Sequence, residues 1–286
     1  MMAKARSKTD PAIAIAFGGG GARGIAHIHA IEALDELGLR PAAISGSSIG
    51  AIMGAAMAAG MTGAEVREFA QSILLRRTEV VRRIWQSRPG SLREAIAGGV
   101  RIGQFDIERI LEAFLPKTIP ATFEELKIPL KVTGTDFYGH SLTVMERGDL
   151  RSAIAASAAI PAVFKPVTRD GRLQVDGGMY NPVPFDLLVG EADIVIAVDV
   201  IGAPEDSGRA PTAIDLMFGT SQLLMLSIME AKLALNQPDI YLRPAVSRFR
   251  VLDFMKFEQI LADTAGLKDE LKRGVEAAVE KRAKGG

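Results

Sequence analysis

The chain has 286 residues, with 34 Lys and Arg against 34 Asp and Glu, so its formal net charge is +0. This balance excludes a global field that would attract nucleic acid, and a Cys count of 0 excludes disulfides and thiolate chemistry. Hydrophobic residues make up 48% of the chain, which suffices for one large α/β domain with a sizeable core.

The amino-terminal stretch has no features of a secretory signal. Residues 1–10 are polar and basic, and the apolar run at 12–17 is too short for the apolar region of a signal peptide. No window approaches the roughly 20 apolar residues that span a bilayer. We therefore expect a cytoplasmic protein, with a single domain over residues 1–286, that meets a membrane only peripherally.

A glycine-rich loop follows the first predicted strand. Residues 13–17 have the content of a buried strand, and residues 25–37 carry apolar side chains at helical spacing. Between them, Gly19, Gly21 and Gly24 match the dinucleotide-binding pattern G-x-G-x-x-G. A dinucleotide site also needs an acidic residue at the end of the second strand to hold the ribose. Serine and glycine occupy that place here, so the nucleotide interpretation lacks its second half.

The alternative interpretation of this loop is an oxyanion hole. Gly19, Gly20 and Gly21 present successive backbone N–H groups without side chains, which can stabilise negative charge that develops on a substrate oxygen. In a parallel sheet, the loops after the first and second strands reach the same edge. We favour this interpretation because the second predicted strand ends close to a serine, Ser48.

The second predicted strand leads into the sequence GSSIG at residues 46–50, and a run of small residues follows at 51–59. This order of strand, sharp turn and helix fits the G-x-S-x-G pattern of a nucleophile elbow, formed by Gly46, Ser48 and Gly50. A side chain at either glycine would collide with the flanking strand and helix. The pattern alone also fits an ordinary glycine turn.

Residues 61–115 are predicted to be mostly helical and to form a cap. Basic and apolar residues are interleaved over residues 76–93, where Glu79 is the one acidic residue. The arginines of this stretch are Arg76, Arg77, Arg82, Arg83, Arg88 and Arg93. The segment, which includes Trp85, fits peripheral contact with an anionic membrane. It equally fits a solvated helix whose apolar side packs on the domain.

The rest of the chain alternates strands with helices, which predicts a doubly wound α/β sheet. The predicted strands are residues 130–137, 141–145, 173–175, 193–200 and 240–242, and the predicted helices are residues 149–159, 212–236 and 256–284. We expect a motif-bearing core over about 12–200, the helical cap at 61–115 and a mainly helical C-terminal part at 212–286.

A serine nucleophile needs a proton acceptor, and none of the three histidines is well placed to be one. His27 and His29 fall inside the first predicted helix, and His140 falls in a polar turn. The order serine, acid, histidine of other α/β hydrolases requires a histidine far downstream. None follows His140, so the sequence favours a carboxylate.

The best candidate is Asp176, because the Gly177 and Gly178 that follow it allow its backbone to approach another loop. Asp136 and Asp199, at the ends of predicted strands, are the alternatives. An ionised aspartate is a weak base in water, with a pKa of about 3.9. Burial beside the serine would have to raise its basicity.

Three motifs in this order resemble the patatin-like phospholipases: GGGARG at residues 19–24, GSSIG at 46–50 and DGG at 176–178. The stretch 153–167, with AAIPAVF at 158–164, is also similar to the segment before the aspartate in that family. The match extends over roughly residues 12–200. The resemblance implies a three-layer α/β/α fold with a mostly parallel central sheet.

By this resemblance, Ser48 is the nucleophile, Asp176 is its dyad partner, and the loop at 19–21 is the oxyanion hole, which Arg23 helps to hold. The resemblance also implies cleavage of lipid acyl esters, of the phospholipid or lysophospholipid class, without a metal or other cofactor.

Our hypothesis from the sequence is therefore a serine acyl hydrolase. Ser48 attacks the ester carbonyl while Asp176 accepts its proton, and the N–H of Ile49 joins the glycine amides in stabilising the oxyanion. Two other functions would keep the same motifs: transfer of the acyl group to an alcohol or lipid acceptor, and regulatory binding without catalysis. The intact motifs argue against the latter.

Overall fold

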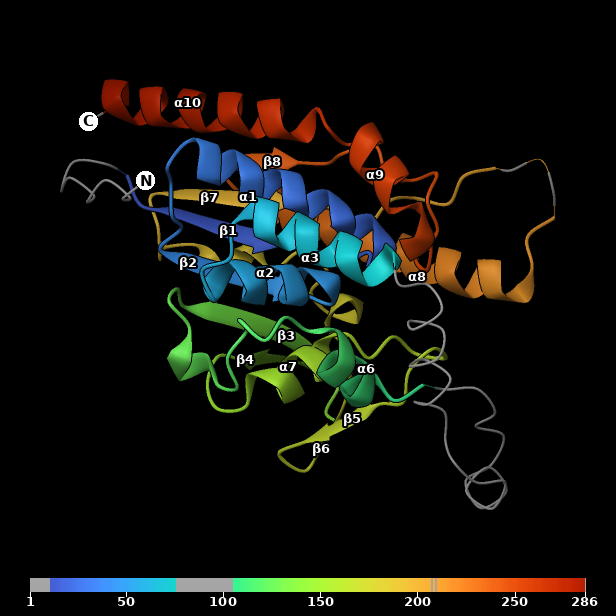
Figure 1. The fold of residues 1–286 in the computed structure, drawn as a ribbon. Coiled ribbons are helices and arrows are strands. Elements are labelled where there is room, and N and C mark those ends of the chain that lie inside the picture. Colours follow the sequence, from blue (N-terminus) through green and yellow to red (C-terminus); the bar gives the residue numbers. More distant parts are fainter. Residues whose placement is uncertain (1–10, 76–104, 207, 209, 286) are drawn as a thin grey trace, which may run out of the picture.

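The computed structural model describes residues 11–75, 105–206, 208 and 210–285. Within them the chain forms an α/β fold around an 8-stranded sheet (Figure 1). The strands are β1 Ile13–Phe17, β2 Ala43–Ser47, β3 Leu130–Asp136, β4 Ser141–Met145, β5 Val167–Arg169, β6 Arg172–Asp176, β7 Ile194–Val198 and β8 Ile240–Leu242.

The helices precede, follow or connect these strands. The α-helices are α1 His27–Glu36, α2 Ile49–Ala58, α3 Gly63–Leu75, α6 Ile107–Phe114, α7 Leu150–Ser157, α8 Ala213–Leu235, α9 Phe257–Asp263 and α10 Leu267–Gly285. The 3-10 helices are η1 Gly21–Ala26, η2 Phe123–Glu125, η3 Gly177–Met179, η4 Phe185–Leu188 and η5 Phe254–Lys256.

The sheet is mixed but mostly parallel. Its strand order is β5-β6-β3-β2-β1-β7-β8, and β4 pairs with β3. The strands from β3 through β2, β1 and β7 to β8 are all parallel to their neighbours. β4 and β6 run antiparallel to β3, and β5 runs antiparallel to β6. This arrangement confirms the predicted fold class.

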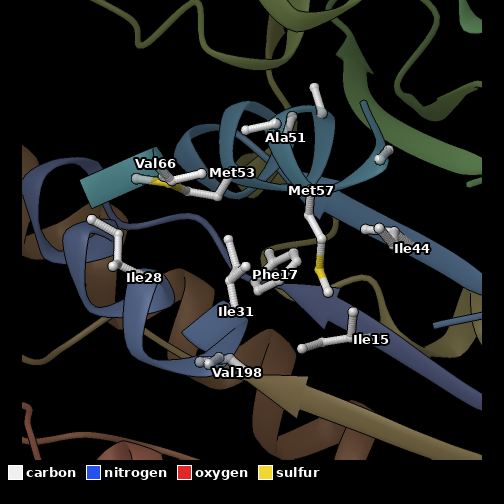
Figure 2. Close-up of a cluster of buried hydrophobic side chains, with 14 of the residues drawn as sticks. Ile15, Phe17, Ile28, Ile31, Ile44, Ala51, Met53, Met57, Val66 and Val198 are labelled. Atoms are coloured by element: carbon white, nitrogen blue, oxygen red, sulfur yellow. The ribbon is translucent and has the colours of Figure 1, made fainter. Parts of the chain in front are cut away.

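Both faces of the sheet are covered, and each strand divides its side chains between them. In β1, Ile13, Ile15 and Phe17 belong to a buried cluster with residues of α1, α2, α7 and α10. Ala14 and Ala16 belong to a second cluster, with residues of η4 and α8. Because side chains alternate along a strand, the sheet is the middle of three layers. Figure 2 shows the first cluster between β1, α1 and α2.

Strand β3 brings the ends of two other strands together. β2 pairs with residues 130–133 of β3, so that Ser47 lies beside Thr133. β6 pairs with residues 134–136, so that Asp176 lies beside Gly134. Because β4 pairs with residues 132–136 from the opposite edge, β2 and β6 share one edge of β3. The C-terminal ends of these two strands therefore meet head to head.

The observed elements differ from the predicted ones in three places. The first helix starts as η1 and becomes α1 at His27. β5, a strand of 3 residues that pairs with β6, is not among the predicted strands. The predicted helix at 256–284 is two helices, α9 and α10, and the Thr264 hydroxyl donates to the Ile260 carbonyl oxygen at 2.7 Å where α9 ends.

The structure describes α3 and α6 of the segment predicted to be helical at 61–115. Residues 76–104, which contain the arginine-rich stretch, lie outside the described residues. Contact of that stretch with an anionic membrane therefore stays a prediction. In the described part of the chain, no helix combines the length and the apolar character needed to cross a bilayer.

Gly50 lies against β1, and a Cβ at this position would stand 2.1 Å from the backbone oxygen of Phe17. We predict that Gly50→Ala lowers the free energy of unfolding by about 2 kcal/mol or more, because a backbone atom cannot move aside as a flexible side chain can. Gly266→Ala is the matched control, since no atom lies within 4 Å of its added methyl group. Denaturant titration measures both, and equal losses would contradict the packing argument.

Candidate active site

Ser48 stands at the turn between β2 and α2 in a strained backbone conformation. Its φ of 55° and ψ of −123° lie outside the regions that residues with a side chain favour. The turn is tight enough that a Cβ at Gly46 would stand 2.5 Å from the Gly50 oxygen. Strain of this kind persists where the surrounding structure enforces it, and it is concentrated at functional sites. The GSSIG sequence thus has the geometry expected of a nucleophile elbow.

Ser48 and Asp176 are joined by a short hydrogen bond. The Ser48 hydroxyl donates to Asp176 Oδ2 over 2.5 Å, and each residue is 4% exposed. The other carboxylate oxygen, Oδ1, accepts a hydrogen bond from the Gly178 amide at 2.8 Å. Asp176 ends β6 and Ser48 directly follows β2, so the head-to-head arrangement of these strands on β3 produces the contact.

Burial raises the pKa of the Asp176 carboxyl to about 6, because desolvation penalises its charged form. The hydrogen bonds from Ser48 and Gly178 act in the opposite direction and lower this pKa, with less effect. A carboxylate with a pKa of about 6 is ionised at neutral pH, yet it binds a proton more tightly than an ordinary aspartate. It is suited to accept a proton from the hydroxyl that it contacts.

The three histidines are engaged elsewhere. His27 is fully buried and donates from Nε2 to the Gly18 carbonyl oxygen at 2.8 Å. Burial lowers its pKa to about 4, so its ring is neutral at pH 7. His29 binds a carbonyl oxygen of α9 at 2.9 Å, and His140 is exposed in the turn between β3 and β4. In the described part of the chain, none of them shares a hydrogen bond with Ser48.

The two alternative aspartates take part in local structure. Asp136 accepts a hydrogen bond from the Gly139 amide at 2.8 Å and pairs with Arg172 at 3.2 Å. Asp199 accepts a hydrogen bond from the Tyr241 hydroxyl at 2.5 Å. Of the three aspartates that the sequence suggests, the one that contacts the serine is Asp176, the last residue of β6.

The glycine loop lies beside Ser48, since a Cβ at Gly19 would stand 3.3 Å from the Ser48 Cβ. The Gly19 amide itself donates to the Pro182 carbonyl oxygen at 2.9 Å, which leaves it unavailable to a ligand. The amides of Gly20 and Gly21 have no acceptor among the described residues. Of the three glycine amides that the sequence suggests as donors, those of Gly20 and Gly21 are therefore free among the described residues, and that of Gly19 is not.

The backbone amides of Ser48 and of the next residue, Ile49, have different roles. α2 begins at Ile49, so the N–H of this residue has no acceptor within the helix. The Ser48 amide donates to the hydroxyl of Ser157, the last residue of α7, at 2.8 Å. Ser157 is fully buried, and its hydroxyl helps to fix the strained turn through this hydrogen bond. No motif in the sequence marks Ser157, which stands among the small residues before the aspartate.

Arg23 ties the glycine loop to the C-terminal part of the chain. Its guanidinium donates to the carbonyl oxygens of Phe249, at 2.7 Å, and Ile201, at 2.5 Å. The side chain is almost completely buried, and desolvation lowers its pKa to about 10. These two bonds link the glycine loop to segments near residues 201 and 249, and the part of Arg23 in an oxyanion hole stays a prediction.

The remaining motif glycines allow close approach between neighbouring segments. Gly24 packs against the Ile49 side chain, and Gly177 packs against the backbone of Thr133. Both contacts join a motif to the element that positions the serine or the aspartate. Larger residues at these places would push the motifs apart.

These groups line one pocket with largely apolar walls. Gly20, Gly21, Ser48 and Asp176 share it with apolar residues of α8, which are Met217, Phe218 and Met225. Among the described residues, no group of three or more His, Cys, Asp or Glu side chains is arranged to hold a metal ion. The pocket brings together a hydroxyl, a carboxylate of raised basicity and free amides, which acyl transfer through a serine requires.

The fold and the pocket define an α/β protein with a hydrogen-bonded serine–aspartate pair, whose serine stands at a tight turn from strand to helix. The model of the patatin-like phospholipase family matches residues 15–189, which is more than half of the chain, and the protein belongs to this family.

Relatives and solved structures extend the comparison. An uncharacterized NTE family protein of Mycobacterium tuberculosis is 37% identical over 207 residues, which is 72% of this chain and 54% of that protein. Human patatin-like phospholipase domain-containing protein 6 is 28% identical over 287 residues, which cover 90% of this chain and 20% of that protein. The crystal structure of VipD from Legionella pneumophila matches with a TM-score of 0.46 and 14% identity, over 94% of this chain and 66% of that chain. The chain thus spans about half the length of the mycobacterial relative.

We predict that the pKa of Asp176 in the folded protein is about 6. Ser48→Ala should raise it further, because the serine hydroxyl donates a hydrogen bond that favours the charged form. A carboxyl ¹³C NMR titration measures the pKa, and Asp176→Asn assigns the resonance by its loss. A wild-type pKa close to the ordinary value of about 4, or a lower pKa in Ser48→Ala, would contradict the prediction.

Proposed function

We propose that the protein is a serine acyl hydrolase that cleaves lipid acyl esters of the phospholipid or lysophospholipid class. The observation that carries this proposal is the 2.5 Å hydrogen bond from the Ser48 hydroxyl to Asp176, in a pocket with apolar walls. Membership of the patatin-like phospholipase family supports the lipid ester as substrate.

In the first half of the reaction, Ser48 Oγ attacks the ester carbonyl carbon and its proton passes to Asp176 Oδ2 along the existing hydrogen bond. A C–O bond forms, and the carbonyl electron pair moves to the oxygen. When the tetrahedral intermediate collapses, the alcohol leaves and takes the proton from Asp176. An acyl-enzyme on Ser48 remains.

The oxyanion of this intermediate requires donors near the serine. The proposed donors are the amides of Gly20 and Gly21, which have no acceptor among the described residues, and the N–H of Ile49 at the start of α2. The positive end of the α2 dipole adds to their effect, because it lies where negative charge develops. The amide of Gly19 is not among the proposed donors, because it donates to the Pro182 carbonyl oxygen.

In the second half, water attacks the acyl-enzyme and gives its proton to Asp176. The acid is released, and Ser48 regains the proton. An alcohol acceptor in place of water would yield acyl transfer instead, and mass spectrometry of the products with and without an acceptor lipid separates the two reactions. The apolar side chains of α8 in the pocket would surround the acyl chain.

We expect Ser48→Ala and Asp176→Asn each to lower kcat/KM for a chromogenic acyl ester by about a thousandfold or more, because each removes one member of the dyad. A fluorophosphonate should label the wild-type protein at Ser48 and leave Ser48→Ala unlabelled. Asp136→Asn is the matched control and should keep activity within a few-fold. The dyad is wrong if Ser48→Ala or Asp176→Asn folds and retains full activity.

The pH dependence should follow the ionisation of Asp176. The carboxylate must be charged to accept the serine proton, so kcat/KM should fall about tenfold per pH unit below about 6 and level off above it. A pH–rate profile with a soluble ester measures this dependence. An activity that stays constant down to about pH 4, the ordinary value for aspartate, would rule out Asp176 as the base.

A further inference from the structure

Helix α8 has an apolar outer face. Its residues 216–229 include no charged side chain, whereas a helix on a protein surface normally turns a charged face to water. On the inner side, Met225 is buried against the sheet. On the outer side, Leu216, Leu223 and Leu224 are each more than half exposed. Figure 1 shows that the first turns of α8 project beyond the body of the fold.

A second apolar segment lies beside the start of α8. Leu252, Phe254 and Met255 are exposed in η5 and immediately before it. An ion pair between Arg250 and Asp215, at 3.8 Å, joins this segment to α8. The ion pair thus places two exposed apolar segments, distant in the sequence, next to each other.

This surface borders the mouth of the pocket that holds Ser48. Met217 of α8 is exposed to solvent and also lines the pocket. Val251, next to the exposed Leu252, lines the pocket as well. Met217 and Val251 therefore connect the apolar lining of the pocket to exposed apolar residues on the outside of the protein.

In the part of the chain that the structure describes, the charged residues that flank the apolar ones on these two segments form ion pairs. Asp215 pairs with Arg250, and Asp253 pairs with Lys256 at 2.8 Å. An apolar surface with a neutral border fits the boundary between the headgroups and the acyl chains of a bilayer. It offers no net charge for a nucleic acid or an acidic protein to bind.

We propose that this docking surface, formed by Leu216, Leu223, Leu224, Leu252, Phe254 and Met255, rests on a lipid surface and sets the mouth of the pocket over it. The inference rests on the proposed function, because it describes how the same site obtains its lipid ester. An acyl chain that moves from a bilayer directly into the pocket never contacts water. This route avoids the free-energy cost of exposing each methylene group to water. A neutral apolar contact also predicts binding that salt does not weaken.

Vesicle binding tests the docking surface independently of catalysis. Binding of the Ser48→Ala protein to phosphatidylcholine vesicles is measured by co-sedimentation in about 0.15 M and about 1 M salt. We expect binding at both salt concentrations, and a loss of about tenfold or more in the partition coefficient on adding Leu223→Gln and Leu224→Gln. Neither leucine lines the pocket, so the same pair in the active protein should lower the ratio of vesicle to soluble-ester hydrolysis.

Val189→Gln is the matched control. Val189 is about as exposed as the two leucines. It precedes β7 and so lies near the N-terminal ends of the parallel strands, whereas the pocket lies at their C-terminal ends. It should leave vesicle binding unchanged, and thermal unfolding should show that all variants are folded. Inactivity of the wild-type protein toward every ester would end the proposed function, while vesicle binding would still decide the docking surface.

Three results would overturn the docking surface. The first is the absence of vesicle binding by the Ser48→Ala protein. The second is binding that the two leucine substitutions leave unchanged, whether or not salt abolishes it. The third is a dimer in sedimentation velocity that these substitutions dissociate, because the face would then be an interface between two copies of the chain.

Discussion

The contact between the Ser48 hydroxyl and the Asp176 carboxylate depends on how two strands end against a third. The two side chains are 128 residues apart in the sequence and 2.5 Å apart in space. β2 and β6 meet on one edge of β3, and Thr135 of β3 donates to the Asp176 backbone oxygen at 2.9 Å. A slip of one residue in either register would move a side chain by about 3.3 Å and turn it to the other face of the sheet. The registry of β3 is therefore the constraint on which the rest of the site depends.

The basicity of Asp176 depends on whether a neighbouring cation forms an ion pair with it. Arg23 lines the same pocket, but its guanidinium is bonded to the carbonyl oxygens of Ile201 and Phe249. A salt bridge to Asp176 would hold the carboxyl pKa low and weaken it as a base. With the cation bonded to backbone oxygens, desolvation has the largest effect and the pKa of Asp176 rises to about 6. One buried arginine thus positions the loop without neutralising the carboxylate.

The sequence predicts the groups whose chemistry is written in short motifs. Ser48 and Asp176 are recognisable because glycines at fixed spacing surround them, and the α/β fold class follows from the alternation of strands and helices. The Ser157 hydroxyl and the bond from the Gly19 amide to Pro182 are contacts between distant segments, which no local pattern encodes. The break between α9 and α10 is missed for a different reason, because the amphipathic pattern of the sequence continues through it.

The motifs and the pocket walls come from different parts of the chain. The match to the family model ends at residue 189, and it includes the serine, the aspartate and the glycine loop. α8 and Val251 lie beyond it, yet they form much of the apolar wall. The proposed reaction depends on residues of the part that the family model matches, whereas much of the apolar wall that would select an acyl chain belongs to the part that follows. Under the proposed function, substitutions of the pocket-lining residues of α8 should therefore alter which ester is cleaved and leave the contact between Ser48 and Asp176 unchanged.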